Sequence, residues 1–162
     1  MGNTGNRGNI KTQVTKKYRK MAVLGIVAEP HIGYNEAKDF TSLICWQKAR
    51  MVKLFFHSKI IPVIPKEEQF NLTFQMRKSC VSITENIAEG YGRFHYQELL
   101  QFCRISRGSL YELKDDLITC LDLKYISRET YDEGLQLIEA TKITLNGYMK
   151  YIKEQKAKFL EK

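Results

Sequence analysis

The sequence predicts an all-α protein: an up-down-up-down antiparallel four-helix bundle preceded by a flexible basic N-terminal tail. After residue 37, apolar residues recur at helical spacing in four long segments, and no segment shows a strand-like alternation of useful length. The connections between these segments are only a few residues long, which makes neighbouring helices pack antiparallel. We therefore divide the 162-residue chain into a disordered basic extension, residues 1–37, and a four-helix bundle, residues 38–162.

The tail differs from the rest of the chain in composition. Its first 20 residues, MGNTGNRGNIKTQVTKKYRK, are rich in Gly and Asn and contain no acid, which favours disorder. Because six basic residues lie there, they account for most of the net charge of +8. The apolar run MAVLGIVA, residues 21–28, leaves a secretory signal open as an alternative, although it is short and its basic lead is long. A translation start at Met21 is also open.

The first helix is expected over residues 37–60, before Pro62 and Pro65. Its main apolar stripe predicts a core face, made of Phe40, Leu43, Ile44, Met51, Leu54 and Phe55. A second stripe lies on nearly the opposite side, made of Trp46, Ala49, Phe56 and Ile60. This second stripe belongs either to a thick core or to a subunit interface with Trp46, Phe56 and Ile60 as its contact residues.

Three more helices complete the predicted bundle. The second opens after Pro65, with Glu67 and Glu68 in its first turn, and ends at the glycines near residue 91. Its expected inward residues are Phe70, Cys80, Ile83, Ile87 and Ala88. The third spans residues 95–123, and the fourth begins at Ser127 or Thr130. Gly108, Gly134 and Gly147 lie inside these helices and indicate either close backbone approach or weaker helices.

No familiar catalytic or cofactor pattern occurs in the chain. The three histidines have no Glu three residues before them, which excludes the usual di-iron motif, and their spacing with the four cysteines fits no zinc site. Phosphate-binding glycine loops are absent as well. The dispersed cysteines are typical of reduced core residues in a cytoplasmic protein. We expect no enzyme, cofactor, metal, small-molecule substrate or membrane span.

Basic and aromatic residues interleave around the second and third helices. Arg93, Arg104 and Arg107 with Lys78 lie among Tyr91, Phe94 and Tyr96, a pattern that fits single-stranded RNA through phosphate contacts and base stacking. A solvated helix face looks the same in one sequence, so that alternative stays open. The expected nucleic-acid-binding set also includes four tail residues, Lys16, Lys17, Arg19 and Lys20.

Several charged residues have structural interpretations. Glu85 and Glu89 could form an acid/base pair, but the polar face of a helix explains them better, and Glu85 is placed to pair with Arg104. Arg77 falls on the apolar side of its helix, so it should extend outward or meet Glu112 or Asp116. Its role is then either to fix the register of the hairpin or to contact an anionic partner.

Four sequence blocks resemble a known family. CWQKAR, PKEEQFNLTFQMRKS, SITENIAEGYGR and FCRISRGSLYEL, within residues 39–153, resemble the signature blocks of bacterial four-helix bundle proteins encoded in intervening sequences of 23S rRNA genes. That family is similar in fold to the accessory variability determinant of diversity-generating retroelements, which forms a ring, binds nucleic acid and partners a reverse transcriptase. The family pattern marks the following residues: Trp46, Pro65, Glu68, Gln75, Arg77, Ser82, Asn86, Glu89, Gly90, Arg93, Gly108, Ser109 and Glu112.

The resemblance implies a homo-oligomer, a pentameric ring, and no catalytic site. Seven of the marked residues are expected to build the helical hairpin: Arg77, Ser82, Asn86, Glu89, Gly90, Gly108 and Glu112. The leading hypothesis is a non-enzymatic oligomer that binds RNA or another nucleic acid. The alternatives are an accessory protein that binds a reverse transcriptase and a purely structural adaptor between proteins.

Overall fold

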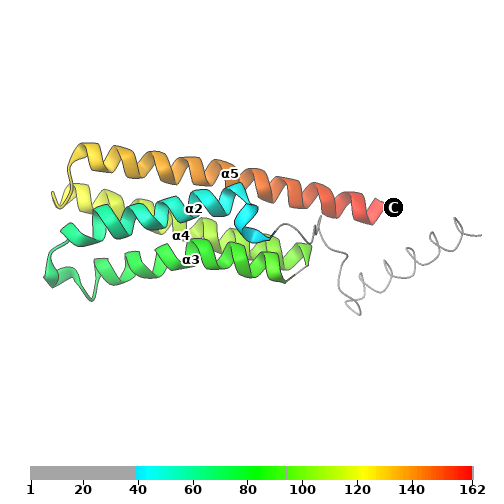
Figure 1. The fold of residues 1–162 in the computed structure, drawn as a ribbon, viewed down its shortest axis with the longest axis horizontal. Helices are drawn as coiled ribbons and strands as arrows, with labels where there is room; N and C mark the ends of the chain where they lie inside the picture. Colours follow the sequence, from blue (N-terminus) through cyan, green and yellow to red (C-terminus); the bar gives the residue numbers. More distant parts are fainter. Residues whose placement is uncertain (1–38, 94, 162) are drawn as a thin grey trace, which may run out of the picture.

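The computed structural model describes residues 39–93 and 95–161, and in them four long helices form one antiparallel bundle (Figure 1). These helices are α2 (Ile44–Phe55), α3 (Leu72–Gly92), α4 (Tyr96–Asp122) and α5 (Arg128–Glu161). Each helix packs on the helices before and after it, and α5 closes the bundle on α2. No strand occurs in the described residues. The predicted all-α four-helix bundle is confirmed, whereas the expected tail lies outside the described residues.

The core runs along the bundle axis and contains mainly aliphatic side chains. Its largest fully buried members come from all four helices and the turn after α2: Val52, Phe56, Ile60, Met76, Ile83, Ile87, Leu110, Leu113, Leu117, Ile138, Leu145 and Ile152. Burying a side chain of this size stabilises the fold by about 1.5–3 kcal/mol. All four cysteines are free and buried, and burial raises the pKa of the Cys45 thiol to about 11.

The apolar stripes of the first helical segment are covered differently from the main prediction. Phe56 and Ile60 are fully buried, which agrees with the thick-core alternative, so their assignment to a subunit interface is wrong; Phe55 of the expected core stripe is buried as well. Trp46 is half-buried and packs edge-on against Phe40, with ring centroids 5.2 Å apart. From the predicted core stripe, Ile44 and Met51 are instead exposed. Periodicity shows that two stripes exist, but the positions of α3 and α5 decide which one is covered.

Three short turns separate α2 from α3. They are the π-helical turn η2 (Phe56–Ile60) and the 3₁₀ turns η3 (Ile61–Val63) and η4 (Lys66–Glu68). Proline at residue 62 removes a backbone donor and is incompatible with a continuing α-helix. The expected start of α3 after Pro65 is wrong, because Glu67 and Glu68 lie in η4. Phe70, expected in the core, is 88% exposed.

The connection from α4 to α5 uses local backbone chemistry. Lys124 has a positive φ of 60° and lies in the αL position that ends a helix. Ser127 caps α5, since its Oγ accepts a hydrogen bond of 3.2 Å from the Thr130 amide. The cap at Ser127, rather than at Thr130, is therefore the correct one of the two alternatives.

Only one of the three glycines expected at close approaches lies at one. A Cβ on Gly134 would come within 2.8 Å of the Phe55 ring and 2.9 Å of a Leu117 methyl group, so side chains of α2 and α4 pack directly on the α5 backbone there. Around Gly108 and Gly147 a Cβ would meet no atom of the described residues within 4 Å. Of the two alternatives, close approach is therefore wrong at these positions, and the weaker helix stays a prediction.

Candidate nucleic-acid interface

The contact between α3 and α4 is the most extensive in the bundle and is lined by short polar residues. The Ser82 and Ser109 hydroxyls are 2.8 Å apart, and Ser79 donates a 2.7 Å hydrogen bond to Glu112. Asn86 donates to the Ser82 carbonyl at 2.8 Å. We call this contact the α3/α4 seam. Its side chains are short and hydrogen-bonded, so the two backbones come close without leaving these polar groups unsatisfied.

Gly90 closes the seam at its hairpin end. A Cβ at this position would lie 2.8 Å from Phe102 Cβ and 3.3 Å from Leu99 Cα. These atoms belong to the backbone or lie next to it, so they cannot move aside by rotating a side chain. Two residues on, Gly92 is exposed, and no atom of the described residues lies within 4 Å of such a Cβ. Gly90 is therefore required by packing, whereas Gly92 is not.

The seven residues expected to build the hairpin fall into two groups. Four of them lie in the seam: Ser82, Asn86, Gly90 and Glu112. Glu89 holds Arg93 through an ion pair at the surface, and Gly108 is exposed. Arg77 is exposed and forms no ion pair with Glu112 or Asp116, so of its two expected arrangements the outward extension is confirmed and the pairing is wrong.

Beside the seam lies a small acidic depression of about 210 Å³. Burial, followed by the charges of Asp115 and Glu112, raises the pKa of Asp116 to about 6. The buried Oδ2 of Asp116 has no hydrogen-bond partner in the described part of the chain. Nowhere in that part do three or more His, Cys, Asp or Glu side chains come together in a way that could hold a metal. An acidic depression repels phosphate, so nucleic acid is not expected here.

The four bundle cations expected to bind nucleic acid do not share one surface. Arg93 pairs with Glu89 at 2.5 Å and lies 5.5 Å from the Phe102 ring centroid. Hydrogen bonding to Glu89 raises the Arg93 pKa. Arg107 donates to Asn146 of α5 at 3.1 Å, whereas Lys78 lies on the outer side of α3. Arg104 contacts Gln101 at 3.4 Å and forms no ion pair with Glu85, so that predicted pair is wrong.

A different group of cations gathers where α2 meets α3. Lys53 of α2 donates to Thr84 Oγ1 of α3 at 3.0 Å. Burial, and then the positive charges of Arg77 and Lys53, lowers the pKa of His57. Lys53 therefore contacts α3 at Thr84, which lies two turns after Arg77 and on the same side of that helix.

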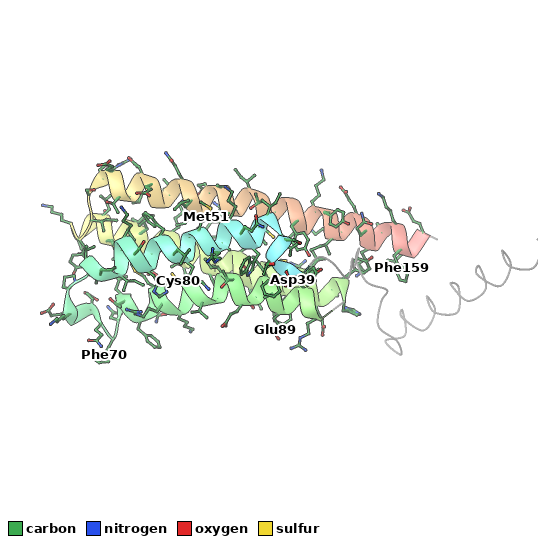
Figure 2. All side chains as sticks on the ribbon, in the orientation of Figure 1. Asp39, Met51, Phe70, Cys80, Glu89 and Phe159 are labelled. Carbon is green, nitrogen blue, oxygen red and sulfur yellow. The ribbon has the colours of Figure 1, made fainter. Side chains whose placement is uncertain are left out.

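Next to this group, the outer side of α3 is hollowed by a depression of about 520 Å³. It is lined by Phe74, Arg77, Lys78 and Val81, together with Glu85 and the two seam residues Ser82 and Asn86. The Phe74 side chain is 56% exposed, and Phe70 lies farther along at the edge of the bundle (Figure 2). Within residues 39–93 and 95–161, none of Lys53, Arg77 and Lys78 has an ion-pair partner. We call Lys53, Phe74, Arg77 and Lys78 the basic face.

Residues 41–147, which run from before α2 into the second half of α5, match the family of 23S rRNA-intervening sequence proteins. The chain belongs to this family. No curated protein matches the sequence. Membership confirms the resemblance seen in the sequence blocks, and this family is not one of known enzymes. The relation to diversity-generating retroelements stays a prediction. No helix in the described part of this family member is both long and apolar enough to cross a membrane.

A second surface of this 23S rRNA-intervening sequence protein is apolar. It follows the line where α2 lies beside α5 and includes exposed Ile44, Met51 and Tyr151. Part of it is hollowed by a depression of about 450 Å³, lined by Ile44, Gly147 and Tyr151 among others. Figure 2 labels Met51 on α2, where it lies two turns after Ile44 and therefore on the same side of the helix. We call Ile44, Met51 and Tyr151 the α2/α5 surface.

Sequence reasoning found only part of the basic face. It included Lys78 in the nucleic-acid-binding set and kept an anionic partner open for Arg77, but it assigned Phe70 to the core and did not combine Lys53 and Phe74 with these cations. One signal could have indicated the true arrangement. Phe70, Phe74, Arg77 and Val81 recur at helical spacing in a stripe about 120° around the helix from the stripe of Met76, Cys80, Ile83 and Ile87. Since one helix cannot bury both stripes in a small bundle, one of them had to face solvent.

Proposed function

We propose that this 23S rRNA-intervening sequence protein is a non-enzymatic homo-oligomer that binds RNA, with the basic face as its RNA contact. The observation that carries the proposal is the lack of ion-pair partners for Lys53, Arg77 and Lys78 in the described residues. Arg77 and Lys78 line one depression of α3, and Lys53 contacts the same helix at Thr84. Mutual repulsion makes such a group unfavourable unless an anion neutralises it. Phosphate groups of RNA supply that anion.

The other cations contribute less in this proposal. Arg93 already has Glu89, and Arg107 already has Asn146. Arg104 is exposed and can reach a long RNA that also contacts the basic face. The tail residues Lys16, Lys17, Arg19 and Lys20 lie outside the described residues and stay in the proposal as a second, separate phosphate-binding segment.

The test measures binding of a labelled single-stranded RNA to the full-length protein by fluorescence anisotropy at several salt concentrations. We expect Lys53→Gln/Arg77→Gln/Lys78→Gln to weaken binding at least tenfold at moderate salt. Because this variant can no longer neutralise about three phosphates, the slope of log K against log salt should become shallower by about 2.

The matched control removes three cations that already have partners. Lys114→Gln/Arg128→Gln/Lys142→Gln changes the net charge equally, but Lys114 and Lys142 pair with Glu139, and Arg128 pairs with Asp132. We expect this control to keep most of the affinity. Equal reductions in affinity in both triple variants, or no binding by the wild type, would overturn the proposal.

The homo-oligomer is proposed to assemble through the α2/α5 surface. Contiguous exposed apolar side chains mark interaction sites, and Ile44, Met51 and Tyr151 are exposed together in the single chain. Light scattering on the full-length protein should give a particle of five chains of 18.9 kDa, in keeping with the ring implied by the family. Met51→Lys should reduce that mass, whereas Val63→Lys, which charges an exposed apolar residue in η3, should not. A wild-type monomer would contradict this part.

A further inference from the structure

The basic face combines cations with exposed aromatic surface. Phe74 lines the same depression as Arg77 and Lys78, and 56% of it is exposed. Phe74 lies one turn before Lys78, so both project from the same outer side of α3. Leaving a phenyl ring in water beside two cations without ion-pair partners gives the folded chain no stability. The arrangement suits a ligand that has both negative charge and flat apolar surface.

We propose that the basic face takes unpaired nucleotides, with phosphates on Arg77 and Lys78 and a base stacked on Phe74. This inference rests on the proposed RNA-binding function and names the class of RNA. In a duplex the base faces are stacked on one another and cannot reach a protein ring, so only single strands, loops and ends use Phe74. Stacking of a base on an aromatic side chain strengthens binding by about tenfold or more.

The depression also orients the strand. Glu85 lies at the rim, on the same helix as Arg77 and two turns further on. Its carboxylate repels phosphate, so the backbone of the RNA lies on the Arg77 and Lys78 side. The volume of about 520 Å³ falls within the range of ordinary ligand sites, about 300–1,000 Å³, and has room for a base beside the ring.

The test compares two RNAs of equal length on the full-length protein, one unstructured single strand and one blunt duplex, by anisotropy at one salt concentration. Phe74→Ala should weaken single-strand binding about tenfold, the equivalent of one stacked base, and leave duplex binding within about twofold. Phe74→Tyr should restore the wild-type affinity, because a phenol ring stacks equally well.

The matched control is Tyr111→Ala. Tyr111 is also an exposed aromatic beside a cation, but its ring contacts Lys142 of α5, 4.5 Å from the centroid, away from the α2/α3 contact. We expect no change in RNA affinity from this substitution. If Tyr111→Ala and Phe74→Ala have equal effects, removal of any exposed aromatic ring rather than the basic face is responsible, and the inference is overturned.

Two further results would overturn the inference but not the proposed function. One is a Phe74→Ala variant that binds both RNAs as the wild type does, while the Lys53→Gln/Arg77→Gln/Lys78→Gln variant still binds more weakly. The other is a fall in particle mass with Phe74→Ala and unchanged RNA affinity, which would make this ring a contact between copies of the chain. Failure of the wild type to bind either RNA removes both proposals together.

Discussion

The α3/α4 seam and the basic face adjoin each other on the same helix, with Ser82 and Asn86 at their border, yet polar residues in the two regions behave in opposite ways. In the seam, Ser79 and Ser82 each have a hydrogen-bond partner on α4. On the basic face, Arg77 and Lys78 have no ion-pair partner among the described residues. The comparison teaches that polarity alone does not separate structural from functional residues. Structural and functional residues are instead separated by whether the polar group has a hydrogen-bond or ion-pair partner within the fold.

Side-chain length explains the difference. Short serine side chains let two helices approach closely, and their hydroxyls then form hydrogen bonds across the contact. The long arms of Arg and Lys keep their charges in water, where they remain available to an external anion. We therefore expect substitutions in the seam to change the free energy of unfolding, whereas substitutions on the basic face should change RNA affinity and leave stability almost unaltered.

The largest expected effect is at Gly90, where the seam can be broken by a single methyl group. Gly90→Ala places a Cβ 2.8 Å from Phe102 Cβ, and we expect a decrease of about 2 kcal/mol in the free energy of unfolding. Urea denaturation of the full-length protein measures it. Gly92→Ala is the control, because a Cβ there meets no atom of the described residues and Ala favours the helix by up to about 1 kcal/mol. Equal changes in the two variants would show that close packing at Gly90 is unimportant.

An intermediate effect is expected at Asp116, beside the seam, where one carboxylate oxygen has no hydrogen-bond partner among the described residues. The folded-state pKa of about 6 lies above the ordinary value, so folding favours the protonated acid. Stability from this group is complete below about pH 4 and is lost as the pH rises through 6.

Asp116→Asn removes that pH-dependent destabilisation, and we expect it to stabilise the protein by about 1 kcal/mol at pH 7, a figure reduced for partial solvent exposure. The same substitution should have no stabilising effect at pH 4. Urea denaturation of wild type and variant at both pH values checks the prediction. A stabilisation of the same size at both pH values would mean that ionisation of Asp116 is not its cause.

The smallest effect on stability is expected on the basic face. Arg77→Gln and Phe74→Ala should each change the free energy of unfolding by less than about 0.5 kcal/mol, because both side chains are exposed. The same urea experiment tests this. A decrease above about 1 kcal/mol in either variant would remove the contrast between the two regions of α3 and assign these residues to the fold.

The long, regular parts of the fold could be predicted from sequence. Expected bounds of 95–123 for the third helix compare with Tyr96–Asp122 for α4, and Ser127 is one of the two expected caps for α5. Apolar periodicity and capping are local, so one sequence is enough to recognise them. The start of α3 could not be placed as well, because the η4 turn and the exposure of Phe70 depend on how the chain leaves α2.

The candidate sites show the same limit more strongly. Arg93, Arg104 and Arg107 are close in sequence. In the fold, however, Arg93 forms an ion pair with Glu89, and Arg107 donates a hydrogen bond to Asn146 of α5. Lys53 and Arg77 lie on different helices, yet the positive charge of each lowers the pKa of His57. Residues on different helices meet only through tertiary packing, so their charges cannot be combined into a surface from sequence spacing.

The sequence by itself determined the fold class, the helices of the bundle and the family, because each depends on patterns within one segment or on blocks in order along the chain. The tertiary structure decided three further points. It chose which stripe of α2 is buried, which glycine lies at a close approach and which cations lack ion-pair partners among the described residues. Each depends on what a neighbouring helix covers or pairs with, and the same amphipathic helix can turn either stripe inward until its neighbours are in place.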